Sequence, residues 1–132
     1  MFDAMYGPIA PPDLAAMDAT FAPYVRRGLA DGSYRGWLAC TGDRHVVAGG
    51  GLIVHEWPAR PGDPNAHRAY ILNVYTEPAY RRQGIAQWIM TTILEWCRAQ
   101  GLRTVFLHAS AYGRPLYESL GFESTNEMRL SL

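Results

Sequence analysis

The sequence contains no lysine, and this absence excludes one common kind of phosphate site. All twelve basic residues are arginines, and twelve acidic residues balance them to a net charge of zero. A nucleotide-triphosphate loop needs a Lys next to a Ser or Thr, so such a loop is excluded. The balanced charge argues against a protein that binds nucleic acid or an anionic membrane, although Arg81 and Arg82 form one local basic spot.

Cysteines and long apolar runs are also scarce. The two cysteines, Cys40 and Cys97, are far apart and outside any metal-ligand spacing, so we expect two buried free thiols and no metal site. The first thirteen residues lack the basic start and apolar run of a signal peptide, and no apolar segment approaches the ~20 residues that span a bilayer. These absences predict a cytoplasmic protein with no membrane partner.

The remaining pattern predicts one mixed α/β domain over residues 1–132. After an irregular lead-in through Pro12, Asp13 is expected to cap a helix that ends near residues 28–32. Three glycines, residues 49–51, indicate a bulge or a close backbone approach in the second strand of a hairpin. The expected elements after the first helix are two antiparallel strands around the TGDR turn (33–40 and 45–57), a loop (58–67), a central strand (68–76), a helix from 84 to about 100, a strand (103–110), a short helix closed by Gly121, and a final strand (124–132).

One short turn, residues 81–86, has few glycines, but it lies between a predicted strand and a predicted helix, where an anion could bind. The first N–H groups of a helix have no partner within it, and the helix dipole is positive there, so an anion can accept several of them. Gly84 leaves room for a phosphate oxygen, Ala86 keeps the next turn shallow, and Arg81 or Arg82 can add a charge-assisted contact. The alternative is a tight turn beside a solvated arginine pair. A dinucleotide-binding fingerprint needs three glycines and is absent.

The order of NVYTEPAYRRQGIA, a long helix, a strand and GRPLYESLGF resembles the GNAT superfamily of N-acetyltransferases. The family's (Gln/Arg)-x-x-Gly-x-(Gly/Ala) motif is matched by Arg81, Gly84 and Ala86. Its LYExLGF box is matched by residues 116–122. The resemblance covers residues 70–122 closely and the upstream hairpin more loosely. It implies a mixed, mostly antiparallel sheet flanked by helices, with a strand–helix–strand core that binds the coenzyme.

The resemblance also implies an acyl donor, acetyl-CoA, and the positions that hold it. The pyrophosphate is expected on the backbone amides of the turn, and the pantetheine arm along a splayed, bulged strand just before it. A backbone N–H at that bulge is expected to polarise the thioester carbonyl. The expected coenzyme-binding residues are Val74, Tyr75, Thr76, Arg81, Arg82, Gln83, Gly84, Ile85, Ala86 and Ser110.

In the same family a tyrosine usually protonates the departing thiolate, and Tyr117 occupies the matching position. Its phenol is protonated at neutral pH; the alternative is a packed aromatic of an amphipathic helix. Ser110 stands where many members have an Asn, and as a smaller donor it is expected to reach the coenzyme arm less well. The family's opening strand is not recognisable here. This shortened N-terminus predicts an open sheet edge that residues through Pro12 or a partner chain covers, which makes a homodimer a hypothesis.

The sequence does not single out a general base or an acceptor. Residues near strand ends that could take a proton or position a water are His55, Glu56, Asn73 and His108. Tyr34, Trp37 and Trp57 could line an acceptor pocket or pack in the core. The leading hypothesis is therefore acetyl transfer to a primary amine of a small molecule or peptide by direct attack. The alternatives are a non-catalytic acyl-CoA sensor on the same fold, or a structural or nucleic-acid-binding domain.

Overall fold

The computed structural model describes residues 10–132, in which four strands form one open, mixed sheet. The strands stand in the order β1-β2-β3-β4; the first two neighbouring pairs are antiparallel, and β3 and β4 are parallel. Their bounds are β1 Tyr34–Cys40, β2 Val46–Glu56, β3 His67–Thr76 and β4 Val105–Leu107. The predicted fold class, the hairpin and the inner position of the third strand are thus confirmed.

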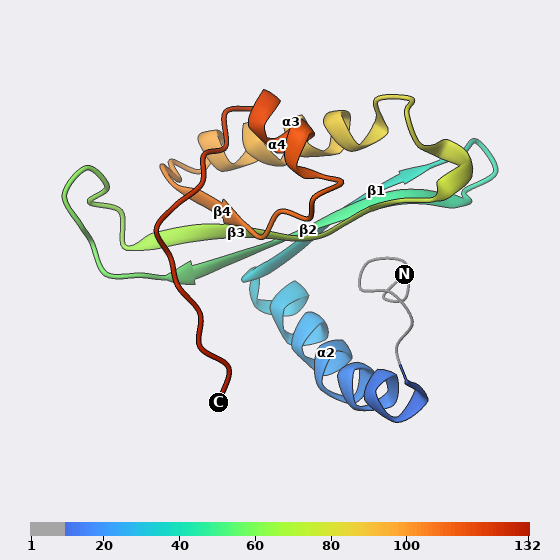
Figure 1. Ribbon diagram of the computed structural model, residues 1–132, viewed down its shortest axis with the longest axis horizontal. Helices are drawn as coiled ribbons and strands as arrows, with labels where there is room; N and C mark the ends of the chain where they lie inside the picture. Colours follow the sequence, from blue (N-terminus) through green and yellow to red (C-terminus); the bar gives the residue numbers. More distant parts are fainter. Residues whose placement is uncertain (1–9) are drawn as a thin grey trace.

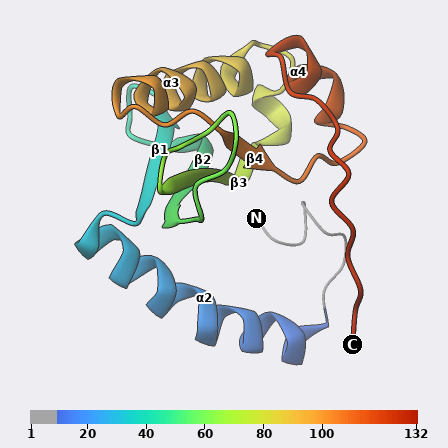
Figure 2. The same cartoon turned by 90° about the vertical axis from the view of Figure 1, so that its left-hand side faces the viewer.

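Helices lie on both sides of this sheet (Figures 1 and 2). Helix α3, Ile85–Ala99, connects the parallel strands β3 and β4 and lies on one face together with the short helix α4, Arg114–Ser119. Helix α2, Pro11–Asp31, lies on the opposite side. A single 3-10 turn, η1 at Pro78–Tyr80, follows β3. No helix among residues 10–132 combines the length and the apolarity needed to cross a membrane.

The core lies between the sheet and α3, as the helical spacing of the apolar residues predicts. Ile89, Met90, Ile93 and Cys97 form the buried stripe of α3. The largest fully buried side chains are Leu52, Ile71, Met90, Ile93 and Cys97. The cysteine prediction was half right, since Cys97 is a buried thiol but Cys40 is exposed. Cys40 points away because β1 is an edge strand and its alternate side chains face outward.

The start of the first helix differs from the prediction. Helix α2 begins at Pro11, ahead of the predicted cap at Asp13, and its N-cap is Ala10 without a side-chain cap; the rest of the predicted lead-in, residues 1–9, lies outside the described residues. Proline suits the first helical positions because its φ is already helical and its missing N–H needs no partner there. Asp13 is therefore an acidic residue of the first turn, where it faces the positive end of the helix dipole. Coverage of the β1 edge by residues 1–9 lies outside the described residues.

The C-terminal half also departs from prediction at two places. Strand β4 has three residues rather than the eight predicted, because it leaves β3, its one partner among the described strands, after the pair Ile71↔Leu107. The predicted final strand over residues 124–132 is wrong, since that segment has no regular structure and pairs with none of the described strands. It leaves α4 and runs down one side of the molecule to the level of α2 (Figures 1 and 2).

Candidate active site

The main feature of the site is an opening between the parallel strands β3 and β4. The two strands pair only from Ala69↔Val105 to Ile71↔Leu107, while β3 continues to Thr76. The predicted coenzyme-binding residues Val74, Tyr75 and Thr76 lie on this continuation, where none of the described strands pairs with β3 on the β4 side. The free backbone groups of such a strand can pair with an extended ligand.

A bulge in β3 shapes this opening. Between the pairs Gly49↔Tyr75 and Gly51↔Leu72, β2 advances by two residues and β3 by three. The extra residue is therefore in β3, not in the glycine run of β2 that the sequence suggested. Asn73 has a left-handed φ of 55°, which Asn tolerates better than most residues. A bulge bends its strand, and this one lies where β3 and β4 separate.

Asn73 also carries an unpaired hydrogen-bond donor. Its Nδ2 is buried and has no hydrogen-bond partner among residues 10–132. Such a donor costs about 1–3 kcal/mol when it stays unsatisfied, and few occur in native proteins. The geometry at the bulge therefore provides a donor suited to a carbonyl or amide oxygen of a ligand.

The turn between η1 and α3 provides a row of free amides. Within residues 10–132 no hydrogen bond uses the backbone N–H groups of residues 82–86, and α3 has no side-chain cap. Gly84 is the N-cap, with a left-handed φ of 79°, and a Cβ built there would meet nothing within 4 Å. Arg82 is also left-handed, with φ 61°. Left-handed residues in a turn just before a helix N-terminus can direct successive N–H groups to one side and form an anion-binding concavity, which is the chemistry expected for a pyrophosphate.

The two arginines of the turn differ in their roles. Arg81 donates from Nε to the carbonyl oxygen of Thr76 at 3.0 Å, and its guanidinium lies 5.8 Å from the ring centroids of both Tyr75 and Tyr112. It thus links the end of β3 to the loop that follows β4. Arg82 is exposed and makes no such contact within the described chain, so its side chain is the one free to meet an anion.

Tyr117, the predicted general acid, lies on α4. It is half-buried against the hydrophobic core, and its ring centroid is 6.1 Å from that of Phe122. Burial raises the pKa of the phenol above its ordinary value of 10.0, so the group holds its proton at neutral pH and can donate it. Gly113 lies against the ring, since a Cβ at that position would come 2.8 Å from Tyr117 Cε2.

Ser110 holds the loop before α4. Its Oγ accepts from the N–H of Gly113 at 3.0 Å, and its carbonyl oxygen accepts from the N–H of Arg114 at 2.9 Å. Its hydroxyl hydrogen remains free to donate to a ligand. This residue is exposed, as a contact to a coenzyme arm requires.

The structure distinguishes the three possible proton acceptors near strand ends, and Asn73, which the sequence offered to position a water. His55 accepts from Arg68 Nε at 3.0 Å, so its lone pair is used. Glu56 is paired with His67 at the start of β3, at the end of the strand away from the opening. Asn73 is an amide and cannot serve as a base near neutral pH. His108 follows the last residue of β4 and is exposed.

His108 lies at the opening, on the face of the sheet away from α3. Leu107 packs against the core under α3, so the next side chain points to the opposite face. The ring of His108 packs edge-on against Tyr70, with 5.4 Å between centroids. Its ring nitrogens have no hydrogen-bond partner among residues 10–132. Of the four candidates, His108 alone combines this position with a free imidazole.

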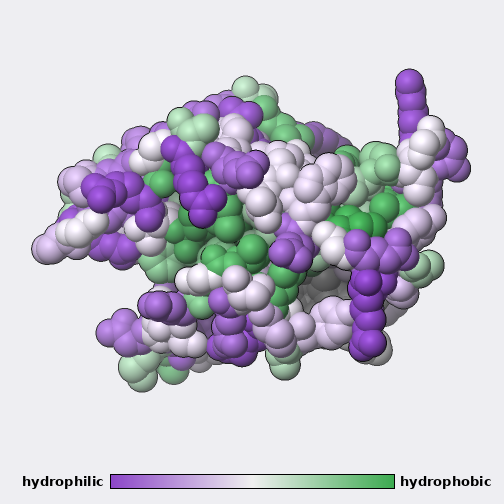
Figure 3. Space-filling model, turned by 90° about the horizontal axis from the view of Figure 1, so that it is seen from above, coloured by the Kyte–Doolittle hydropathy of each residue, from purple (hydrophilic) through white to green (hydrophobic). Residues whose placement is uncertain are grey.

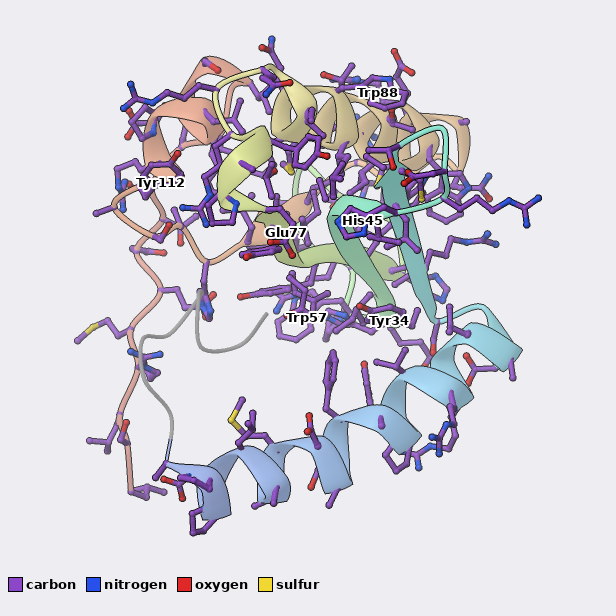
Figure 4. The ribbon with its side chains drawn as sticks, turned by 90° about the vertical axis from the view of Figure 1, so that its right-hand side faces the viewer. Tyr34, His45, Trp57, Glu77, Trp88 and Tyr112 are labelled. Carbon is purple, nitrogen blue, oxygen red and sulfur yellow. The ribbon has the colours of Figure 1, made fainter. Side chains whose placement is uncertain are left out.

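Sequence reasoning did not single out Glu77, which directly follows β3. Its amide donates to the carbonyl oxygen of Val47 at 2.8 Å, and the residue is partly buried. Figure 4 shows its side chain beside the end of β3, below η1. Its only sequence signal was a carboxylate placed between a strand and a proline.

The aromatic residues suggested for an acceptor pocket do not gather at one place. Trp37 faces α3, where its ring centroid is 6.0 Å from that of Trp96, so it belongs to the core side. Tyr34 lies on the other face between the sheet and α2 (Figure 4), packed edge-on against Tyr24. Trp57 lies beyond β2, under the guanidinium of Arg68 at 3.5 Å. These three residues do not define a pocket.

The surface over α3 and α4 has both hydrophobic and hydrophilic regions. Seen from that side, hydrophobic residues gather along the middle of the face, and hydrophilic side chains surround them (Figure 3). Trp88 on α3 and Tyr112 beside α4 are exposed there (Figure 4). Residues 10–132 hold no group of three or more His, Cys, Asp or Glu side chains that could bind a metal.

Known proteins share both this fold and this sequence pattern. Residues 4–122 match the Acetyltransferase (GNAT) family. A GCN5-related N-acetyltransferase from Ralstonia eutropha JMP134 is 38% identical, with a TM-score of 0.90 over 98% of this chain and 86% of that one. A predicted acetyltransferase from Clostridium acetobutylicum, solved with acetyl-CoA, is 26% identical, with a TM-score of 0.85 over 99% of this chain and 80% of that one.

A curated relative points to the same family. Glucosamine 6-phosphate N-acetyltransferase from Trypanosoma brucei brucei is 31% identical over 88 residues, which are 66% of this chain and 58% of the relative. The chain spans between 39% and 58% of the lengths of the curated relatives it matches. The family match, the TM-score of 0.90 and the bulged, splayed strand before the amide-lined turn agree. The chain belongs to the GNAT family of acetyltransferases.

Proposed function

We propose that the protein transfers an acetyl group from acetyl-CoA to a primary amine by direct attack of the amine nitrogen on the thioester carbonyl. The observation that carries this proposal is the continuation of β3 past its last pair with β4, leading directly into a turn with unpaired amides. An extended arm that ends in a pyrophosphate fits these two features together, because one needs a strand edge and the other an anion site.

The opening and the turn offer the kinds of groups that the coenzyme needs. The amides of residues 82–86 would hold the pyrophosphate, with the exposed Arg82 beside them. The backbone of residues 74–76 would pair with the pantetheine arm, and Ser110 would donate to it from the other side of the opening. Asn73 Nδ2 would satisfy its missing hydrogen bond on an oxygen of the bound coenzyme. When bound, acetyl-CoA supplies an activated acyl group.

Two side chains of this chain would move the protons. Attack by a neutral amine leaves a proton to be removed from its nitrogen, and His108 stands on the face of the opening that α3 does not cover. The departing thiolate needs a proton, and the phenol of Tyr117, which is protonated at neutral pH, can supply it; burial raises its pKa further. The C–S bond breaks as the C–N bond forms, so no acyl group is held by the protein.

The acceptor is a primary amine, and the trypanosomal relative provides one specific candidate for a test. That relative is named for glucosamine 6-phosphate, which carries a primary amine and belongs in a panel with polyamines, amino acids and peptides. Thiol release from acetyl-CoA would be measured with each amine in turn. Turnover with at least one amine is expected.

Tyr117→Phe tests the proton donor within the same assay. It should lower the rate of thiol release by about 10²–10⁴-fold and leave coenzyme binding unchanged. Tyr24→Phe, on α2 and outside the site, is the matched control and should keep the full rate. Tight coenzyme binding without turnover on any amine would instead favour a non-catalytic acyl-CoA sensor. Absence of coenzyme binding would contradict both functions.

A further inference from the structure

Arg68 of β3 is a partly buried arginine whose charge no carboxylate of the described chain balances. Among residues 10–132 the one ion pair joins Arg114 to Glu118 on α4. Arg68 Nε donates to His55 Nε2 at 3.0 Å, and the other N–H groups of the guanidinium have no hydrogen-bond partner within the described residues. Burial lowers the pKa of His55, and the charge of Arg68 lowers it further, so this histidine is neutral at neutral pH.

Two aromatic rings hold the guanidinium of Arg68 in place. Its central carbon lies 3.5 Å from the ring centroid of Trp57 and 4.4 Å from that of Phe106. These cation–π contacts and the hydrogen bond to His55 fix the plane of the guanidinium. A restrained arginine loses less side-chain entropy on binding a ligand than an arginine that moves freely in solvent. Arg68 is thus a cation oriented before a ligand binds.

Arg60, the second arginine beside Phe106, has a different electrostatic environment. Its guanidinium lies 5.5 Å from the ring centroid, and it donates to Thr104 Oγ1 at 3.3 Å. The same hydroxyl donates to Asp63, which lowers the pKa of this carboxyl, and the charge of Arg60 lowers it further. Arg60 therefore has a carboxylate nearby, and Arg68 has none among its described contacts.

Arg68 lies on the same face of the sheet as His108, the face away from α3. Ala69 and Ile71 are buried in the core under α3, so Arg68 and Tyr70, which alternate with them, face the other side. Trp57, which contacts Arg68, also lies on this side, towards α2 (Figure 4). His108 packs edge-on against Tyr70, and two residues of one strand are about 7 Å apart. The cation and the candidate base are therefore near neighbours on one surface.

We propose that the acceptor is a primary amine that also carries an oxyanion, either a carboxylate or a phosphate, and that Arg68 binds this oxyanion. The inference rests on the proposed acetyl transfer, in which His108 takes the proton of the attacking nitrogen. The planar fork of a guanidinium matches two oxygens of a carboxylate or a phosphate, and such charge-assisted hydrogen bonds are roughly twice as strong as neutral ones. With its nitrogen at His108 and its anion at Arg68, the acceptor would span two to three strand residues, roughly 7–10 Å.

Matched pairs of amines test the anionic group. Initial rates of thiol release would be measured with glucosamine and glucosamine 6-phosphate, and with unbranched ω-amino acids of increasing length and their amides. In the pairs that react, the anionic member should have a kcat/KM at least about tenfold higher. The sugar pair tests a phosphate, and the amino acids test a carboxylate and its distance from the nitrogen. The advantage should be largest where nitrogen and anion are roughly 7–10 Å apart.

Arg68→Gln should remove this preference, because glutamine keeps a planar amide that can donate to His55 but carries no charge. The KM of the anionic amine should rise about 10- to 100-fold. The rate with its neutral counterpart and the Kd of acetyl-CoA should not change, which also shows that the variant is folded. Arg68→Lys, which keeps the charge without the fork, should retain part of the preference. Arg35→Gln is the control, since that guanidinium lies 4.5 Å from the ring centroid of Trp96 on the α3 side.

The failure of this anion site and the failure of acetyl transfer give different results. Equal kcat/KM for anionic and neutral amines, or a preference that Arg68→Gln leaves intact, would overturn the anion site while acetyl transfer stands. Turnover of no amine would contradict acetyl transfer. In that case calorimetric titration of the coenzyme A complex with the same pairs tests the site. Tighter binding of the anionic member that Arg68→Gln abolishes would support it, and equal binding would overturn it.

Discussion

The backbone of Gly50 in β2 lies directly under Ile89 of α3, so that a Cβ on residue 50 would come 3.0 Å from Ile89 Cγ2. Ile93 Cδ1 would be equally close. Helix α3, which begins after the turn at Gly84, therefore packs directly on the backbone of β2, because Gly50 has no side chain there. The same glycine lies opposite the bulge of β3. Gly50 thus determines both the distance between α3 and the sheet and the space beside the bulge.

Gly50→Ala should lower the free energy of unfolding by about 1–3 kcal/mol, because the added methyl group overpacks the contact with α3. Denaturant unfolding measures this. The matched control is Gly36→Ala in β1, where a Cβ would meet nothing within 4 Å. Equal destabilisation by the two substitutions would show that the contact with α3 is not the cause.

Gly84→Ala should weaken coenzyme A binding more than it weakens the fold. The left-handed backbone costs an Ala about 1–2 kcal/mol, and the new Cβ enters the open space proposed for the anion. Loss of one charged hydrogen bond, about 1.5–3 kcal/mol, corresponds to a roughly 10- to 100-fold rise in Kd.

Gly32→Ala separates the two effects in calorimetric titration. Gly32 follows α2 with φ 82° and also has no neighbour within 4 Å of a built Cβ. It should cost similar stability and leave the Kd unchanged. An unchanged Kd in Gly84→Ala would remove the anion site from this turn.

Asn73→Gly should leave the fold intact and weaken acetyl-CoA binding roughly tenfold. Glycine keeps the left-handed backbone of the bulge, while the buried donor Nδ2 is removed. Arg44→Gly is the control, since Arg44 has φ 67° in the exposed turn between β1 and β2. Binding as tight as in the unmodified protein would mean that Nδ2 does not contact the coenzyme.

His108→Gln should lower the rate of acetyl transfer by about 10²–10⁴-fold, because glutamine cannot take a proton from the amine. The affinity for acetyl-CoA should not change. His45→Gln, in the exposed turn after β1, should keep the full rate. If Glu77→Gln rather than His108→Gln abolished turnover, the carboxylate after β3 would be the base.

Stability should fall in alkaline solution because of Cys97. Burial raises the pKa of its thiol from the ordinary 9.0 to about 11. The folded state thus holds this proton more tightly than the unfolded state, so its stabilising contribution is complete below pH 9.0 and is lost as the pH rises towards 11. Tyr117, with its pKa raised above 10.0, adds to the loss at the upper end.

Thermal unfolding between pH 8 and 11 measures the effect. Cys97→Ala should flatten the decline above pH 9.0, although it lowers stability at every pH through the cavity it leaves. The exposed Cys40 is the control, and Cys40→Ser should leave the slope as it is. A slope that Cys97→Ala does not change would assign the decline to other groups.

Much of the architecture could be predicted from local pattern. The apolar stripe of Ile89, Ile93 and Cys97 predicts α3 because helical spacing shows directly in the order of residues. The hairpin, the inner strand and the turn at Gly84 are equally local. The two matched motifs predicted the family, and residues 4–122 confirm it.

The wrong predictions have one physical cause: whether a segment with a strand-like or bulge-like pattern forms that structure depends on the strands beside it. Residues 124–132 have a strand-like pattern, but a strand forms only beside another strand, and none is available within the described chain. The glycines of β2 indicated a bulge or a close backbone approach; α3 does pack closely on Gly50, but the extra residue of the bulge is in β3. Only the register between the strands determines which partner contains it.

By itself the sequence determined the helical and extended segments, the turn with its glycine, and the family, because each depends on residues close together in the chain. The tertiary structure alone decided that, within residues 10–132, the amides of residues 82–86 have no hydrogen-bond partner and the buried Nδ2 of Asn73 has none either. It also decided that His108 is the candidate base at the opening, because the side of a strand that a residue faces depends on pairing. Pairing joins residues 69–71 to residues 105–107 across the sheet, and spacing along the chain carries no record of that contact.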